Sequence, residues 1–324
     1  MKLNEITLEI TQQCPNFCIH CSSLSSLTCQ IQLDWDAIKA AIDDAISLGV
    51  TIISLSGGEP FLHPDILKIV RYIHSCQLAC NIYTSGIYHD GIHYMPLPES
   101  MLRALCGQVD KLIYNIEAAD EQTYEEIMGV KGGFHHMITS IQRSVRMGLL
   151  VESHTVLMKI NYLLIPQIFE LCEKLKVSKL SFLRLVMQGR ALENVSKTYL
   201  TDEEITDAKK IIRQCSEDFS GKIRLGMPLC DCLERKNCLA GTVKLNIRYD
   251  GNVYPCEAFK NDMPSNLSSN RPENINDKPL RQIYAENDYL KDIRSHLENY
   301  VQMNTCETCI SQYYMKHKKY ILCQ

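Results

Sequence analysis

The sequence lacks long apolar runs and lacks an excess of charge of either sign. No segment approaches the roughly 18 consecutive apolar residues of a membrane-spanning helix, so we expect no membrane partner. The formal net charge is −4 over 324 residues. That balance provides no basic surface for a nucleic-acid backbone, so we expect neither DNA nor RNA as a partner. The first residues also lack the apolar core of a secretory signal peptide.

Cysteine, by contrast, is abundant, with sixteen in the chain. In a protein without a secretion signal, such a number is more typical of metal binding in a reducing compartment than of disulfide bonds. We therefore expect a cytoplasmic, metal-binding protein. The remaining composition, 45% hydrophobic and 22% charged, is that of an ordinary globular protein. The length suits one large domain and one small domain.

Strand-like and helical segments alternate over the first two-thirds of the chain. The six expected strands cover residues 6–10, 51–55, 79–83, 111–116, 150–157 and 179–183. Helices are expected near 35–48, after Pro64, and near 120–128, 134–147, 161–176 and 201–218. Repeated strand–helix units predict an α/β fold with a parallel sheet covered by helices. Six units rather than eight predict an open, partial (β/α)6 TIM-like barrel.

Beyond about residue 220 the pattern changes. Residues 243–254 are typical of two strands joined by an Asp250–Gly251 turn. The stretch 261–279, rich in Asn, Ser and Pro, is expected to be a loop, and helical periodicity weakens. We predict a barrel domain over 1–220 and a small C-terminal domain, built from a β-hairpin and helix, over 221–324.

Three cysteines follow the first strand: Cys14, Cys18 and Cys21, spaced C-x3-C-x2-C. Cysteine thiolates are the usual ligands of iron–sulfur clusters, and three of them leave one of the four irons of a cubane open. An open metal position is where a substrate or cofactor binds. A structural zinc site with His20 as fourth ligand is the alternative, although zinc sites favour C-x2-C pairs. The loops at the carboxyl ends of barrel strands are where chemistry is expected.

This spacing resembles the signature of the radical S-adenosylmethionine (SAM) enzymes, which share the partial six-unit barrel. The resemblance implies a [4Fe-4S] cluster with an open iron that binds SAM. It further implies that the reduced cluster cleaves SAM to methionine and a 5′-deoxyadenosyl radical, which abstracts a substrate hydrogen. A one-electron reductant such as flavodoxin or ferredoxin is then an expected partner.

The resemblance also implies candidate cofactor-binding residues after strands two, three, four and six. They are Ser56, Gly57, Gly58, Glu59, Thr84, Ser85, Asn115, Glu117 and Arg184. The Gly-Gly-Glu run resembles the family motif that contacts the SAM amino group. Ser85 stands where relatives often carry Asn, and Asn115 and Glu117 lie where relatives often contact the ribose or methionine part. Arg184, and residues 188–190 beyond it, are candidates to hold a substrate carboxylate, with a structural ion pair as the alternative.

The C-terminal cysteines resemble the twitch or SPASM extensions of the same superfamily, which house auxiliary iron–sulfur clusters. The expected ligands are Cys238, Cys256, Cys306 and Cys309, which suffice for one auxiliary [4Fe-4S] cluster. The full SPASM pattern requires cysteines where this chain has Met315 and Lys319. Cys232 is an alternative ligand, and a zinc ribbon is the alternative site.

Three functions are compatible with these features. The first is a radical SAM enzyme that crosslinks, oxidises or epimerises a ribosomally synthesised peptide, whose leader is expected to bind elsewhere or to be read by a separate protein. The second is a sugar or aminocyclitol dehydrogenase or epimerase. The third, a non-catalytic iron–sulfur protein, is disfavoured by the Gly-Gly-Glu run. Cys230 and Cys232 are candidate catalytic hydrogen donors, as in the radical SAM epimerases.

Overall fold

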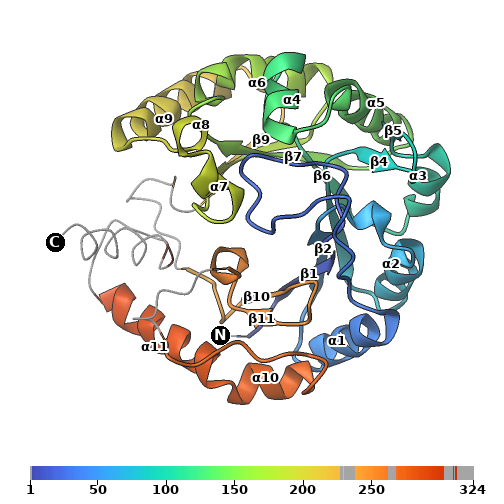
Figure 1. Ribbon diagram of the computed structural model, residues 1–324, viewed down its shortest axis with the longest axis vertical. Coiled ribbons are helices and arrows are strands. Elements are labelled where there is room, and N and C mark those ends of the chain that lie inside the picture. The colour runs from blue at the N-terminus through green and yellow to red at the C-terminus, as the bar shows by residue number, and fades with distance from the viewer. Residues whose placement is uncertain are drawn as a thin grey trace.

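The fold is built on one open sheet of nine strands. A computed structural model describes residues 2–226, 229, 238–261, 268–302, 309 and 311, with only the backbone over 299–302. The strand order is β11-β10-β1-β2-β3-β6-β7-β8-β9. All neighbouring pairs are parallel except β10 and β11, which are antiparallel. Helices form an arc around the sheet (Figure 1).

The strands of this sheet are β1 (Glu5–Thr11), β2 (Ile52–Gly57), β3 (Ala79–Thr84), β6 (Lys111–Asn115), β7 (Val151–Leu157), β8 (Lys179–Arg184), β9 (Lys222–Leu225), β10 (Lys244–Ile247) and β11 (Val253–Tyr254). A separate hairpin joins β4 (Ile87–His89) to β5 (Tyr94–Pro96). The helices are α1 (Trp35–Ser47), α2 (Ile66–Ser75), α3 (Glu99–Leu105), α4 (Glu121–Met128), α5 (Gly133–Arg146), α6 (Ile165–Lys174), α7 (Arg190–Glu193), α8 (Val195–Thr198), α9 (Asp202–Ser216), α10 (Leu280–Glu286) and α11 (Asp288–Gln302). Short 3-10 turns are η1 (Pro60–Leu62), η2 (Tyr162–Leu164) and η4 (Glu257–Phe259).

The predicted partial barrel is confirmed. All six expected strands are present, and the two outermost strands, β11 and β9, do not pair with each other, so the sheet is not closed. The predicted start of α1 is also confirmed, because the carboxylate of Asp34 accepts a hydrogen bond from Ala37 N at 2.8 Å. Asp120 caps α4 in the same way, through Thr123 N. None of the helices in the described ranges is both long and apolar enough to cross a membrane.

The two faces of the sheet differ in character. In β1, Ile6, Leu8 and Ile10 are buried in the apolar core, on the side of the helices. The alternate residues face the interior of the barrel, and in β1 they include Thr7 and Glu9. The barrel interior is therefore lined by polar groups, unlike the aliphatic core that fills a closed TIM barrel.

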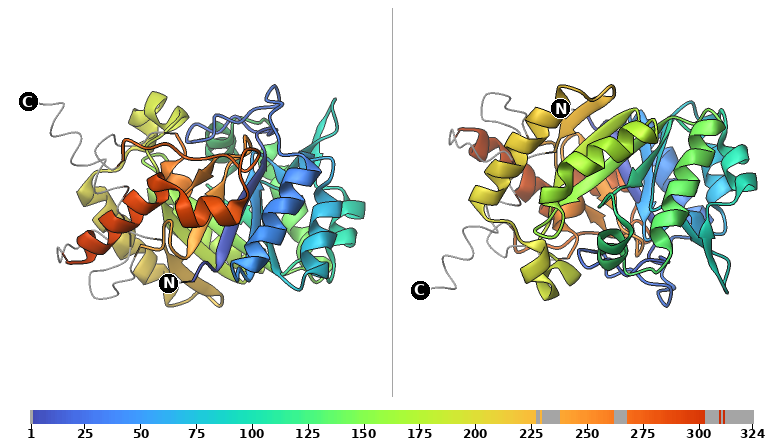
Figure 2. Two further views of the ribbon diagram at one scale, coloured as in Figure 1. Left: turned by 90° about the horizontal axis from the view of Figure 1, so that it is seen from below. Right: turned by 90° about the horizontal axis from the view of Figure 1, so that it is seen from above.

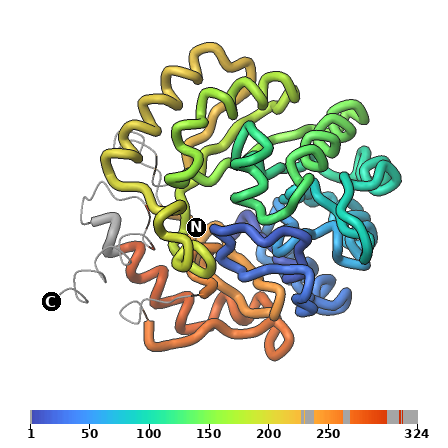
Figure 3. Tube along the Cα trace, turned by 45° about the horizontal axis from the view of Figure 1, so that its top comes forward, coloured from blue at the N-terminus to red at the C-terminus, as the bar shows by residue number. Residues whose placement is uncertain are grey.

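The C-terminal part departs from the sequence-based expectation. β9 adds a parallel strand beside β8, and β10 lies beside β1, so segments beyond residue 220 continue the barrel sheet at both edges. Helices α10 and α11 form where helical periodicity was expected to weaken. Figure 2 shows these helices returning beside α1, where Arg281 pairs with Asp44 at 2.9 Å. Figure 3 shows the same return along the chain trace.

Candidate cofactor and metal sites

The N-terminal cysteine loop leaves the carboxyl end of β1 and is held against α4. Phe17 N donates to Met128 O and Ile19 N to Ile127 O, both at 2.9 Å. Cys14 is buried, and Cys18 and Cys21 are half-buried. The loop is therefore fixed by backbone hydrogen bonds on either side of Cys18.

Arg190, at the start of α7, supports the loop from the other side. Its Nε donates to Cys18 O and its guanidinium also donates to Ser25 O, both at 2.8 Å. The guanidinium lies 4.0 Å from the centroid of the Phe17 ring, and Arg190 N donates to Cys21 O. The sequence left two roles open for residues 188–190: binding a substrate carboxylate or forming a structural ion pair. Arg190 has a structural role, but its partners are backbone carbonyl oxygens rather than a carboxylate.

The Gly-Gly-Glu run packs against the base of the loop. Gly58 N donates to Thr11 O at 2.6 Å, and Glu59 N donates to Gln13 O at 2.8 Å. A Cβ on Gly57 would lie 2.3 Å from Thr11 O, and one on Gly58 would lie 2.1 Å from Gln13 O. Both glycines are required because two backbones meet here. Ser56, just before them, is half-buried.

Glu59 joins the ends of β2 and β3. Its carboxylate accepts hydrogen bonds from Thr84 Oγ1 at 2.7 Å, from Ser85 N at 2.9 Å and from Ser85 Oγ at 2.6 Å. Burial raises the pKa of Glu59 to about 7, an effect that these hydrogen bonds oppose. Three of the predicted cofactor-binding residues therefore contact one another, beside the cysteine loop.

A second buried carboxylate, Glu117, lies beside His20 of the cysteine loop. It accepts from Val156 N at 2.8 Å and from Asn115 Nδ2 at 3.3 Å, and it lies 3.6 Å from His20 Nε2. Burial raises the pKa of Glu117 to about 7. Burial and the charge of Arg190 lower the pKa of His20 to about 4. His20 is therefore neutral at pH 7, and its pair with Glu117 is not an ion pair.

The loop provides the thiol donors that an iron–sulfur cluster requires. The pKa of Cys18 is raised by burial and by the thiols of Cys14 and Cys21, so the three groups share one pocket. In the described ranges, no three His, Cys, Asp or Glu side chains are placed to hold a single metal ion. Asn16 Oδ1 and His20 Nδ1 are buried without a partner among the described residues, and such atoms can accommodate polar groups of a cofactor.

The C-terminal cysteines also converge. Burial raises the pKa of Cys256, and the neighbouring Glu257, Cys238 and Cys309 raise it further. Arg184, predicted to bind a ligand, donates to Cys309 Sγ at 3.5 Å and so lies at this second site. The remaining predicted positions, Cys230, Cys232 and Cys306, lie outside the described residues.

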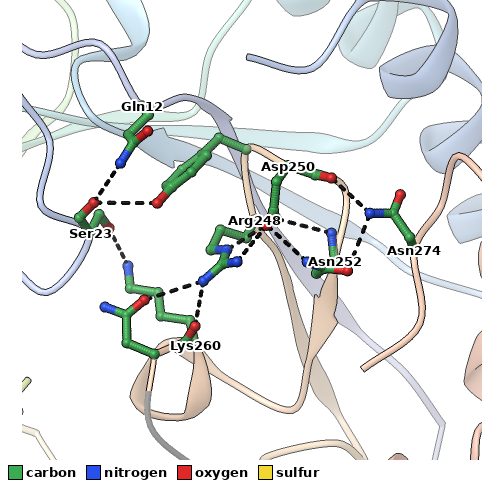
Figure 4. Close-up of polar contacts among 9 residues, drawn as sticks. Gln12, Ser23, Arg248, Asp250, Asn252, Lys260 and Asn274 are labelled. Carbon is green, nitrogen blue, oxygen red and sulfur yellow. Dashed lines mark hydrogen bonds and ion pairs between the residues drawn. The ribbon is translucent and has the colours of Figure 1, made fainter. Parts of the chain in front are cut away.

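A polar network connects the chain segments that follow the two cysteine sites (Figure 4). Lys260 Nζ donates to Glu9 Oε1 at 2.6 Å and to Ser23 Oγ at 2.7 Å. Ser23 O accepts from Gln12 Nε2 at 3.0 Å and from Tyr249 OH at 3.3 Å. Lys260 follows Cys256 by four residues, and Ser23 follows Cys21 by two. The network therefore joins the chain segments that follow the two sites.

Arg248, in the turn between β10 and β11, holds the segment that carries Lys260. Arg248 donates to Lys260 O and forms an ion pair with Asp250 at the hairpin turn. Asp250 O accepts from Asn274 Nδ2 at 2.8 Å. Gly251, within the turn, has φ +87°. The turn that sequence predicted thus fixes the segment carrying Lys260.

The model of the radical SAM superfamily matches residues 8–172, just over half of the chain. The chain belongs to the radical SAM superfamily. The model of the SPASM iron–sulfur cluster-binding domain matches residues 238–310. This radical SAM protein is thus an enzyme that uses SAM and iron–sulfur clusters, as its cysteine spacings predicted.

Two relatives illustrate the range of this similarity. PqqA peptide cyclase of Ruegeria pomeroyi is 28% identical over 309 residues, covering 93% of this chain and 78% of the relative. AdoMet-dependent heme synthase of Methanosarcina barkeri is 24% identical over 323 residues, covering 93% and 88%. Streptococcus suis SuiB bound to precursor peptide SuiA has the same fold, with a TM-score of 0.73 and 16% identity over 91% of this chain and 67% of that one.

Sequence reasoning missed the residues that position the radical SAM cysteine loop. Lys260 and Glu9 carried no motif, and their partners lie up to 251 residues away in the chain. Arg190 was considered as a ligand for a substrate carboxylate or as part of a structural ion pair, but not as a donor to the carbonyl oxygens of the cysteine loop. The available signal was weak: Glu9 is a charged residue between two apolar residues of β1, and Lys260 follows Cys256 by four residues in a polar stretch.

Proposed function

We propose that this radical SAM enzyme modifies a ribosomally synthesised peptide by crosslinking, oxidation or epimerisation. The observation that carries the proposal is the similarity to PqqA peptide cyclases over nearly the whole chain, including the SPASM segment. The polar interior of the barrel supports it, because it offers hydrogen-bonding groups for a peptide between the two cysteine sites.

We further propose that Cys14, Cys18 and Cys21 hold a [4Fe-4S] cluster with one open iron. When bound, the reduced cluster and SAM supply a 5′-deoxyadenosyl radical, which removes a hydrogen atom from the substrate. The chain's own residues fix this site: Arg190 and the end of α4 hold the cysteine loop. Glu59 aligns the ends of β2 and β3, and the buried walls exclude water.

The SPASM segment is proposed to hold one auxiliary [4Fe-4S] cluster through Cys238, Cys256, Cys306 and Cys309. The convergence of the three described cysteines supports it. Such a protein holds about eight iron atoms per chain, whereas about four would remove the auxiliary cluster and about twelve would require a second one. A flavodoxin or ferredoxin is the proposed reductant. The proposed compartment is a reducing cytoplasm, where cysteine-rich chains bind metal more often than they form disulfides.

The test is turnover under anaerobic conditions. Reconstituted, reduced enzyme is incubated with SAM and peptides encoded beside its gene, and products are read by mass spectrometry. We expect 5′-deoxyadenosine together with a changed peptide. A crosslink or oxidation should remove two hydrogen atoms from the peptide. An epimerisation should add deuterium when the reaction is run in deuterated water. Cys18→Ser should abolish both products. Production of 5′-deoxyadenosine without any peptide change, combined with oxidation of a sugar, would instead support the dehydrogenase alternative.

A further inference from the structure

Three side chains form one row across the barrel interior. His154 on β7 is the register partner of Ser181 on β8, which is the register partner of Arg224 on β9. Register partners on parallel strands point to the same face and are about 4.8 Å apart. The neighbours of Ser181, Leu180 and Phe182, are buried in the core on the helix side. Ser181 and its partners therefore face the interior, and we call these three residues the donor row.

The donor row has hydrogen-bonding capacity that the described part of the chain does not use. Ser181 Oγ is fully buried and has no partner there. Arg224 is exposed, His154 is buried, and neither the guanidinium nor the ring nitrogens have a hydrogen bond or ion pair to a described residue. The imidazole instead lies against the ring of Tyr83, with centroids 5.3 Å apart. Buried polar groups are normally satisfied, so an unused hydroxyl in this place indicates a missing ligand.

Positive groups outnumber negative ones around the row. Lys244 pairs with Glu5 at 3.2 Å, and Glu257 lies near both Lys244 and Tyr83. Lys111 and Lys179 both pair with one carboxylate, Glu152, each at 3.1 Å. Lys222 is the register partner of Lys179, so two like charges stand side by side on adjacent strands. Burial first, then Arg224, Lys179, Lys244 and Lys111, lower the pKa of His154 to about 3. The imidazole is thus neutral, with one N–H to donate.

We propose that the donor row binds a carboxylate of the substrate peptide. The Arg224 fork, the Ser181 hydroxyl and the His154 N–H together match the acceptor oxygens of a carboxylate, and the surplus positive charge favours an anion. This assignment rests on the proposed function and names the class of peptide that the site accepts. The carboxylate belongs to an acidic side chain or to the C-terminus of the peptide.

The position of the row suits such an anchor. Val156, which donates to Glu117 beside the cysteine loop, lies two residues or roughly 7 Å further along β7 than His154. Arg184, which contacts Cys309, lies three residues or roughly 10 Å beyond Ser181. A carboxylate in the row would leave the preceding part of the peptide between the two cysteine sites.

The test is affinity selection on the anaerobically reconstituted, full-length enzyme. Random heptapeptides, one library capped as C-terminal amides and one with free carboxylates, are bound and sequenced by mass spectrometry. We expect Asp or Glu enrichment in the capped library if a side chain is bound, or a preference for the uncapped library if the C-terminus is bound. Arg224→Gln and Ser181→Ala should each weaken this preference about tenfold, since each removes a hydrogen bond to a charged group.

The matched control is Lys210→Gln, which removes one exposed positive charge from α9, outside the barrel, and should leave the preference unchanged. Ser181→Ala changes no charge and tests the row even if Arg224→Gln folds poorly. Wild-type enzyme that selects peptides without preference for carboxylates would overturn the inference, as would both variants retaining the preference. A carboxylate preference in a protein that modifies no peptide would refute the proposed function and leave the binding site in place.

Discussion

At the scale of single residues, the chain segments near the two cysteine sites are joined by side chains that lie far apart in the sequence. Lys260 is buried, and its partner Glu9 is only 1% exposed. Asn246 Nδ2 also donates to Glu9. Buried ions of this kind are tolerated only when they are paired, so the loss of one partner is costly.

Lys260→Met should therefore lower the free energy of unfolding by about 3–5 kcal/mol, because it leaves the Glu9 carboxylate buried without its cation. The measurement is urea denaturation followed by circular dichroism. The control, Lys197→Met, removes an exposed pair with Glu126 whose side chains are 49% and 40% exposed. It should cost less than about 1 kcal/mol. Equal losses in the two variants would show that the Glu9–Lys260 pair has no special role.

Arg190→Lys should loosen the cysteine loop while retaining the charge. A lysine ammonium cannot reproduce the two hydrogen bonds to Cys18 O and Ser25 O, nor the planar stacking on Phe17. We expect a loss of about 2–3 kcal/mol in unfolding free energy and faster loss of iron to a chelator. Iron release at the wild-type rate would contradict the supporting role of Arg190.

At the scale of elements, close contact between β2 and the cysteine loop depends on the absence of side chains. Gly58→Ala should displace the loop, because its Cβ would lie 2.1 Å from Gln13 O. We expect lower iron content after reconstitution and weaker SAM binding, measured by iron assay and equilibrium dialysis. Gly107→Ala is the control: Gly107 has φ +72°, and a Cβ there would meet nothing within 4 Å. Gly107→Ala should retain its iron. A Gly58→Ala protein with normal iron content would show that the close approach to Gln13 O does not require a glycine.

The elements that sequence predicted well are those with local signals. Asp34 caps α1, Gly49 follows its end with φ +81°, and the apolar strands of the barrel are continuous enough to recognise. β9 was missed because it has only four residues, too few for their alternating charged and apolar side chains to stand out from a loop. The positions of Glu9, Arg190 and Lys260 could not be predicted, because they depend on contacts between distant parts of the chain rather than on local patterns.

At the scale of the whole molecule, the SPASM segment completes the barrel sheet. β10 pairs with β1 over Glu5 to Leu8, and it supplies the neighbour on the side of β1 opposite β2. The predicted boundary near residue 220 therefore separates sequence patterns but passes through one continuous sheet.

A fragment covering residues 1–220 should consequently fail to fold on its own. It lacks both β9 and β10, so β1 and β8 become exposed edges with unpaired backbone groups. We expect aggregation, or no cooperative thermal transition, by light scattering and circular dichroism. A monomeric fragment with a cooperative transition would show that the barrel is independent of the SPASM segment.

The most direct test of the central claim is the electron paramagnetic resonance spectrum of the reduced, reconstituted enzyme before and after addition of SAM. If the cysteine loop holds a cluster with an open iron, SAM should change the signal of the wild type and of Cys256→Ala, and should leave that of Cys21→Ala unchanged. A wild-type cluster signal that SAM does not alter would contradict the account.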